Sequence, residues 1–180
     1  MGVRRAWLGI VLVLIADLAR ASDHRYAAFI GPSYLDAKGS SLKLTGLHLG
    51  GEATVKIGDC KRLALAGDLS VNSWGGSEGT TNPAQITFTA GPRWAFLGKK
   101  ENHNKAFVHV MVFGLINRSG TEKPVESATA FAFGVGYDWA PGKEHWGSRI
   151  QIDWLQPYSS DVGHGVRVSL GLLYRFKIEE

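Results

Sequence analysis

The chain of 180 residues contains a single cysteine, so no disulfide can form within it. Cys60 follows Gly58 and Asp59 in a polar stretch that has the composition of a turn. No second cysteine and no histidine stands at the spacing of a metal site around it. We therefore interpret Cys60 as an incidental turn residue, and we expect neither a metal nor a cofactor.

The chain also lacks a large excess of positive or negative charge. Lys and Arg together number 20 and Asp and Glu number 16, a formal net charge of +4. Part of this excess lies in the first 21 residues, where Arg4, Arg5 and Arg20 stand against Asp17 alone. Because the remainder has no arginine cluster and no nucleic-acid motif, we expect no nucleic-acid partner.

Helical periodicity and catalytic motifs are missing as well. No convincing amphipathic helix follows the N-terminus, and Gly75-Gly76 lacks the lysine of a phosphate-binding loop. Histidines such as His48 and His109 occur with many serines, but no pair forms a recognisable nucleophile–base motif. We expect no enzyme, and an outer-membrane lipid-modifying activity remains a minor alternative.

The first 21 residues predict an export signal. A short basic start is followed by the apolar run AWLGIVLVLI, and Ala19 and Ala21 supply the small residues that precede cleavage before Ser22. An N-terminal membrane anchor is the alternative, but the run is short for a spanning helix and Asp17 ends it. We therefore expect two parts, a cleaved signal at 1–21 and one domain at 22–180.

The rest of the chain consists of strand-like segments with alternating apolar and polar residues. Eight consecutive strands of this length suit an antiparallel up-and-down meander, long enough to cross a bilayer when tilted. The connections after the second, fourth and sixth are expected to be compact, and those after the third, fifth and seventh longer. The expected strands are 26–35, 44–57, 62–74, 84–97, 106–117, 127–140, 146–157 and 165–176.

The strand 127–140 indicates which solvent lies outside the barrel. One face carries large apolar residues that end in Tyr137 and Trp139, and the other carries only alanine, glycine and Asp138. Tiny residues suit the crowded interior of a narrow eight-stranded barrel, and aromatic residues at strand ends suit a membrane interface. We therefore expect a transmembrane β-barrel, with a soluble periplasmic lipid-binding barrel as the rival. The outward aromatic residues at strand ends are Trp94, Phe96, Tyr137, Trp139, Trp154, Tyr174 and Phe176.

Residues 26–176 resemble the eight-stranded outer-membrane β-barrel proteins of the OmpA-like type. The resemblance rests on the segments FAFGVGYDW, IQIDWLQPY and VRVSLGLLYRF and on the strand spacing. It implies integral insertion in a bacterial outer membrane, contact with outer-membrane lipid and folding by the barrel-assembly machinery. The implied assembly signal lies on the last strand, although four residues follow its final phenylalanine here. Its residues are Val168, Leu170, Leu172, Tyr174 and Phe176.

The inward positions collect four acidic and five basic residues. Charges in a narrow lumen need partners, because an unpaired buried charge carries a heavy desolvation cost. We expect a salt-bridge plug in which long arginines such as Arg93 and Arg167 pair with the carboxylates. A gated ion path, as in a small porin, is the alternative. The inward set is Glu52, Lys56, Asp68, Arg93, Asp138, Arg149, Asp153, Arg167 and Arg175.

These features predict a structural role or a role in surface interaction. We expect the protein to be a monomer. The loops around 74–83 and 158–164 are the candidates for contact with a surface ligand, because loops carry the variable function of a barrel. Short polar loops are also simply caps, and the sequence identifies no ligand.

Overall fold

The structure, a computed structural model, describes residues 25–37, 42–57, 60–75, 84–97, 104–119, 126–139, 145–158 and 163–177. The proposed signal segment 1–21 lies outside these residues, as do most of the connections. Nearly all of the described residues lie in strands, and no helix among them is long and apolar enough to cross a membrane. The strands are β1 Arg25–Ala37, β2 Leu42–Ile57, β3 Cys60–Gly75, β4 Ala84–Leu97, β5 Lys105–Ser119, β6 Glu126–Trp139, β7 Trp146–Pro157 and β8 Gly165–Lys177.

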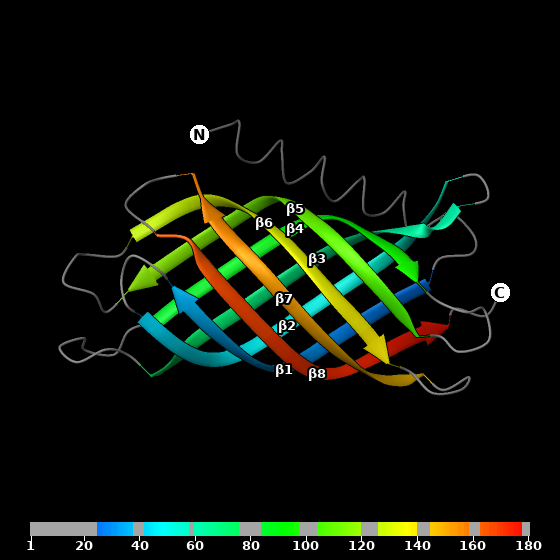
Figure 1. The fold of residues 1–180 in the computed structure, drawn as a ribbon, viewed down its shortest axis with the longest axis horizontal. Helices are drawn as coiled ribbons and strands as arrows, with labels where there is room; N and C mark the ends of the chain where they lie inside the picture. Colours follow the sequence, from blue (N-terminus) through cyan, green and yellow to red (C-terminus); the bar gives the residue numbers. More distant parts are fainter. Residues whose placement is uncertain are drawn as a thin grey trace, which may run out of the picture.

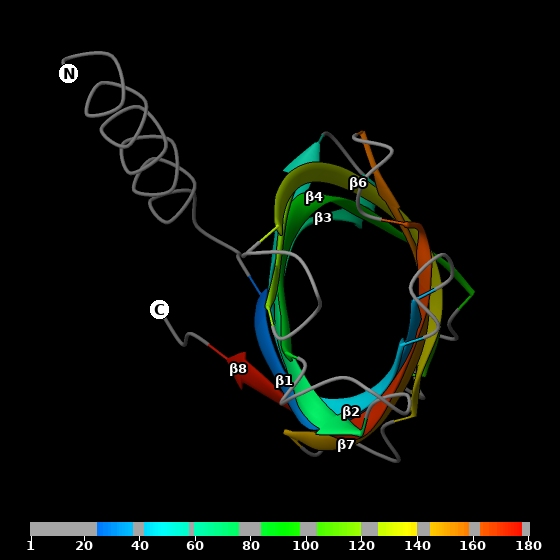
Figure 2. The same cartoon turned by 90° about the vertical axis from the view of Figure 1, so that its left-hand side faces the viewer.

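The eight strands form one closed antiparallel barrel in chain order (Figures 1 and 2). Each strand pairs with the next, and β8 closes the ring by pairing with β1 from Arg25↔Lys177 to Ala37↔Gly165. The rim at which β1 begins and β8 ends is called the termini rim below, and the opposite one the far rim. In Figure 1 the termini rim lies to the right. The eight-stranded meander expected from the sequence is confirmed.

Alternation along the strands separates two surfaces. Side chains that point into the lumen are buried, whereas their neighbours on the outer face are large, apolar and exposed. Leu170 and Leu172 on β8 are 57 % and 56 % exposed, while Arg167 and Ser169 beside them are buried. The facing expected for β2, β3, β4, β6, β7 and β8 agrees with the described side chains.

Two strands lack clear alternation in the sequence because their inner faces are partly apolar. On β1, Phe29 and Leu35 fill the lumen while Ile30 and Tyr34 point outward. β5 carries a bulge, because its register against β6 shifts between Met111 and Gly114. Two consecutive side chains, Val112 and Phe113, therefore both face outward on β5.

The strand bounds correct two expectations. Cys60 is the first residue of β3 and pairs with Ile57, so it lies in a strand and not in a turn. The predicted alternation of loop length is wrong as well. Residues 58–59 between β2 and β3 are a short connection, but 98–104 after β4 are no shorter than 120–125 after β5.

Candidate functional site: the charged lumen

Glu52 on β2 is the centre of the ion pairs nearest the termini rim. Its Oε2 accepts hydrogen bonds from Arg93 Nη1 at 2.7 Å and from Arg149 Nη2 at 2.9 Å. Its Oε1 accepts from Lys105 Nζ at 2.5 Å. One carboxylate thus binds cations from β4, β5 and β7, which are brought together only because the barrel is closed and narrow.

Asp138 on β6 holds the opposite side of Arg149. The guanidinium donates from Nε to Oδ1 at 2.6 Å and from Nη2 to Oδ2 at 2.9 Å, a two-point contact that fixes its orientation. Lys105 lies 3.6 Å and Arg175 3.9 Å from the same carboxylate. Asp138 therefore ties the rim cations to the network around Glu52.

An aromatic ring completes this group. Phe107 on β5 is buried, and the guanidinium carbons of Arg93 and Arg149 lie 4.4 Å and 4.9 Å from its ring centroid. Both distances are within the range of cation–π attraction. Phe29 on β1 lies 5.7 Å from Arg149 on another side. The cations are thus packed as well as paired, which leaves little space between them.

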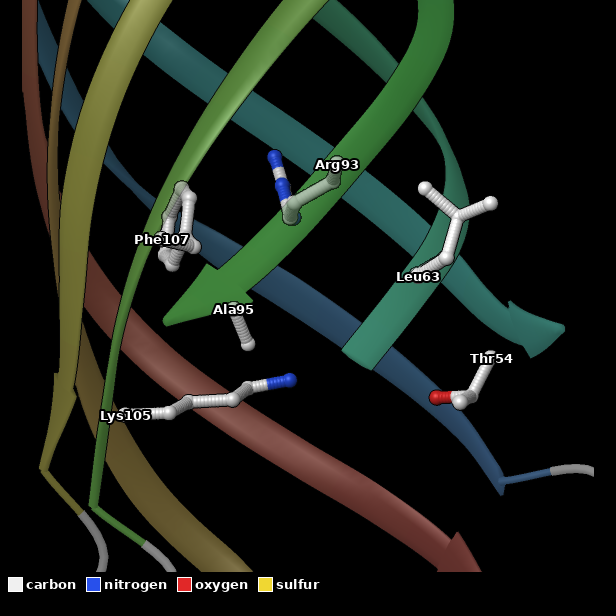
Figure 3. A pocket seen from close by; sticks show the side chains of 7 residues that line it. Thr54, Leu63, Arg93, Ala95, Lys105 and Phe107 are labelled. Carbon is white, nitrogen blue, oxygen red and sulfur yellow. The ribbon is translucent and has the colours of Figure 1, made fainter. Parts of the chain in front are cut away.

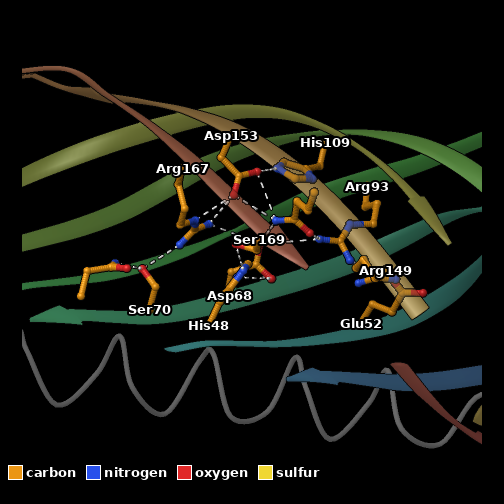
Figure 4. A network of polar contacts seen from close by, with 12 residues as sticks. His48, Glu52, Asp68, Ser70, Arg93, His109, Arg149, Asp153, Arg167 and Ser169 are labelled. Atoms are coloured by element: carbon orange, nitrogen blue, oxygen red, sulfur yellow. Dashed lines mark hydrogen bonds and ion pairs between the residues drawn. The ribbon is translucent and has the colours of Figure 1, made fainter. Parts of the chain in front are cut away.

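A second group of ion pairs lies deeper in the lumen, around Asp153 on β7 (Figure 4). Arg167 on β8 donates to Asp153 Oδ2 from Nε at 2.9 Å and from Nη2 at 2.6 Å. His109 Nε2 lies 2.8 Å from Asp153 Oδ1. The remaining amino group of Arg167 donates to Ser70 Oγ at 2.9 Å, which ties this group to β3.

Gln151 joins the two groups. Its side-chain oxygen accepts from Arg93 Nη2 at 3.1 Å, and its amide nitrogen donates to Asp68 Oδ2 at 3.0 Å and to Asp153 Oδ1 at 3.1 Å. Arg93 also lies 3.6 Å from Asp68. A continuous chain of hydrogen bonds therefore crosses the lumen from Glu52 to Arg167.

His48, Ser169 and Asp68 form an arrangement that resembles a catalytic triad in residue types only. His48 Nδ1 lies 2.8 Å from Ser169 Oγ, and His48 Nε2 lies 3.7 Å from Asp68 Oδ1. The three side chains come from β2, β8 and β3 and are at most 1 % exposed. A nucleophile needs access to its substrate, so this buried arrangement supports a packing role.

The small residues of β6 make room for this network. A Cβ atom added at Gly134 would meet the Asp153 carboxylate and the His109 ring, and one added at Gly136 would meet the Phe107 ring. Ala130 and Ala132 are likewise buried against the lumen. The glycine and alanine face of β6 is thus the space into which the long side chains of its neighbours extend.

Towards the far rim the lumen is filled differently. An apolar cluster occupies this half, together with small polar residues such as Ser33, which donates to Asn72 Oδ1 at 2.7 Å. Side chains therefore fill the described lumen from both ends, as is usual for eight strands. The larger members of the cluster are Leu35, Leu44, Met111, Ile116 and Leu155.

A small cavity of about 50 Å³ lies at the termini rim (Figure 3). Lys105 extends across it from β5, Phe107 lies beside it, and Arg93 limits it towards the network. Its other walls are Thr54, Leu63, Ala64 and Ala95. Among the described residues, no group of three or more metal-binding side chains could hold an ion.

The structure brings together most of the side chains expected in the lumen. Glu52, Arg93, Arg149 and Asp138 meet near the termini rim, and Asp68, Asp153 and Arg167 meet deeper inside. Arg175 lies at the edge and is 20 % exposed. The side chain of Lys56 lies outside the described set. The role of this network stays a prediction.

Sequence reasoning missed several members of the network. Lys105 lies just before the predicted strand 106–117, but it is the first residue of β5 and binds Glu52. His48, His109 and Gln151 are not in the predicted inward set, yet all three are buried in the lumen. Their periodic positions were visible, but each partner lies on another strand far along the chain, so only the barrel geometry pairs them.

Three solved bacterial β-barrels have a similar shape. Neisserial surface protein A has a TM-score of 0.61 at 13 % identity, covering 86 % of this chain and 98 % of its own. The N-terminal β-barrel domain of Pseudomonas aeruginosa OprF has 0.56 at 12 %, covering 86 % and 98 %. The outer-membrane protein OprG of the same species has 0.55 at 9 %, covering 86 % and 96 %.

No family model and no curated protein matches the sequence. The structural likeness at these identities establishes the fold. The chain is an all-β protein with the eight-stranded closed barrel of small outer-membrane proteins, the type that the sequence resemblance indicated.

Proposed function

We propose that this chain is an integral outer-membrane protein whose barrel serves a structural or surface-interaction role and is closed to solutes. The observation that carries the proposal is the division between its two surfaces. Large apolar side chains cover the outside, and the inside holds four ion-paired carboxylates with their cations beside a smaller apolar cluster. A soluble lipid carrier has the reverse arrangement, with the apolar face towards the lumen.

Aromatic residues at the termini rim support insertion in a bilayer. Trp139 and Trp146 are each 57 % exposed, and Trp94, Phe96 and Phe176 also point outward near this rim. Such residues sit at the level of lipid headgroups, where an apolar ring with a polar edge is favoured. Outer-membrane lipid is therefore the partner that this surface fits.

The closing strand carries the proposed signal for the barrel-assembly machinery. Val168, Leu170, Leu172 and Phe176 are exposed on its outer face. Tyr174 is partly covered, because its ring packs 4.7 Å from both Trp146 and Phe176, measured between ring centroids. We propose that the machinery binds this outer face before the strand pairs with its neighbours.

Cell fractionation of the full chain tests the proposed location. We expect the processed chain in the outer-membrane fraction, released by detergent but not by salt or alkaline washing. On a gel, the folded barrel should migrate differently before and after boiling. Recovery of the chain in the soluble periplasm would refute the proposal and favour a soluble lipid-binding barrel.

A further inference from the structure

The paired strands β7 and β8 carry a stacked histidine at each end. His164, which precedes β8, stacks on Trp154 of β7 with the ring centroids 4.8 Å apart and the ring planes at 13°. His145, which precedes β7, stacks on Tyr174 of β8 with the centroids 5.8 Å apart and the planes at 25°. Each histidine thus lies against an outward-pointing aromatic ring of the other strand.

The two histidines lie at opposite edges of the apolar outer surface. The outward side chains between them on β8, among them Leu170 and Leu172, are apolar and exposed. His164 and Tyr174 are ten residues apart, which is about 33 Å along a strand and about 25 Å across a bilayer at the usual tilt. The apolar band of an outer-membrane barrel has this height, so each imidazole lies at the level of the lipid headgroups of one leaflet.

Each imidazole has a ring nitrogen that can bind a ligand. His164 is partly exposed and makes no hydrogen bond with any described residue. His145 is exposed, and its Nδ1 donates to the backbone carbonyl oxygen of Arg175 at 2.8 Å. Because a carbonyl oxygen only accepts, Nδ1 holds the proton of the neutral ring, and Nε2 is the atom that takes up a second proton.

No carboxylate of the described chain holds a proton on His164. Asp36 on β1 faces the same outer surface, in register with Val166 of β8, but it forms no ion pair with His164. On β7 the neighbours are Trp154 and Gln156, which carry no charge. A positive charge on this ring therefore meets an aromatic face on one side and the lipid headgroups on the other.

The charges near His145 are arranged in a similar way. Arg175 of β8 is its neighbour, but the Arg175 guanidinium lies 3.9 Å from Asp138 in the lumen. Trp146 of β7 packs on the same Tyr174 ring with the centroids 4.7 Å apart, and it carries no charge. No acidic side chain among the described residues forms an ion pair with His145. Both imidazoles are therefore open to an anion from outside the barrel.

We propose that these two histidines bind the phosphate groups of lipid headgroups when their rings are protonated, one in each leaflet. Histidine is the side chain that changes charge between about pH 5 and pH 8. The neutral ring belongs to the aromatic belt, whereas the protonated ring gains cation–π attraction to its aromatic partner and a new N–H donor for phosphate oxygen. The contact is therefore present in mild acid and is lost as the pH rises and the ring loses its proton.

The inference rests on the proposed insertion in a membrane and adds to it a proton-dependent preference for anionic lipid. Titration of the folded barrel in neutral detergent with dihexanoyl phosphatidylglycerol tests it at about pH 5 and about pH 8. The indole N–H resonances of Trp154 and Trp146, which lie beside the two sites, report binding by NMR. One cation near an anionic surface strengthens binding about 5-fold, so each site should bind this lipid about 5-fold more tightly at the lower pH.

Two variants keep a flat ring but cannot take up a proton. His164→Phe should abolish the pH dependence at Trp154 and leave it at Trp146, and His145→Phe should do the reverse. Lys43→Gln is the matched control, because Lys43 is exposed at the far rim and is charged at both pH values. It should weaken lipid binding equally at both values and leave their ratio unchanged.

Equal affinity at the two pH values in the folded, unmodified barrel would overturn the inference and leave the proposed membrane insertion standing. So would a pH dependence that both phenylalanine variants retain. Loss of the pH dependence in Asp36→Asn would show that protonated His164 pairs with a carboxylate and not with lipid. Inorganic phosphate that binds as tightly as the lipid would overturn the assignment to a headgroup. A barrel that does not insert in a bilayer would instead refute the proposed function.

Discussion

Side chains fill both halves of the lumen, but different interactions hold them in place. Towards the far rim, Leu35, Leu44 and Leu155 pack without directional bonds. Towards the termini rim, Glu52 and Arg149 belong to a network in which each charge has several partners. Losing an apolar side chain leaves a void, whereas losing one charge leaves its partners unpaired in a place that water reaches poorly. Substitutions in the two halves should therefore destabilise the barrel by different amounts and with different dependence on salt.

The largest effect is expected for Glu52→Gln. This change keeps the shape but removes the charge that holds Arg93, Arg149 and Lys105. Breaking such a buried pair costs about 3–5 kcal/mol, which urea unfolding of the barrel in lipid vesicles can measure. Asp36→Asn is the control at the far rim and should change the free energy of unfolding by less than about 0.5 kcal/mol. Equal effects would mean that water solvates the cations around Glu52.

The apolar half should respond to Leu155→Ala with a loss of about 3 kcal/mol, within the usual range for a buried leucine. The volume-conserving control Leu155→Met should cost less than about 1.5 kcal/mol. Because no charge is uncovered, neither variant should alter the salt dependence of unfolding. A strong salt dependence of the unfolding free energy in Leu155→Ala would show that the two halves are energetically coupled and do not respond separately.

A smaller effect is expected at Gly134, where the charged half needs a residue without a side chain. Gly134→Ala places a methyl group against the Asp153 carboxylate and the His109 ring, so these side chains must shift. The expected loss is about 1–3 kcal/mol, the usual cost of overpacking. Gly51→Ala, also in a strand, is the matched control, because its added Cβ meets nothing within 4 Å. Similar losses in both variants would point to the backbone and not to crowding.

The smallest effect on the finished barrel is expected at the end of β8, where the two faces can be compared directly. Phe176→Ala should lower the fraction of heat-modifiable, folded protein in cells, because Phe176 lies on the outer face proposed as the assembly signal. Arg175→Ala should lower it less, because Arg175 faces the lumen edge near Asp138. If the two variants give equal folded fractions, the outer face of β8 is not what the machinery recognises.

The fold was predictable because alternation is a local property of the chain. β6 carries tiny residues on one face and large apolar ones on the other, so the residues themselves determine which side faces lipid. β1 was ambiguous for the same physical reason, since Phe29 and Leu35 occupy the lumen and remove the contrast. The bulge at Val112 and Phe113 could not be foreseen, because it depends on register with two neighbouring strands.

The network was predictable as a set of inward charges but not as a set of pairs. Arg149 and Glu52 are 97 residues apart in the chain and meet only across the closed lumen. The polar residues that complete the contacts, Gln151 and Ser169, carry no charge that would single them out. Lys105 is not in the predicted network because β5 begins one residue earlier than the predicted strand start at 106.

The claim that the lumen is shut by its side chains is tested most directly by conductance in a planar bilayer. The unmodified protein should show no steady current, because ion pairs and apolar side chains fill the described lumen. Arg93→Ala, which removes the guanidinium between Glu52, Gln151 and Phe107, should unfold at lower urea and admit a leak current. A large steady conductance from the unmodified protein would contradict the closed lumen and make the barrel a small porin.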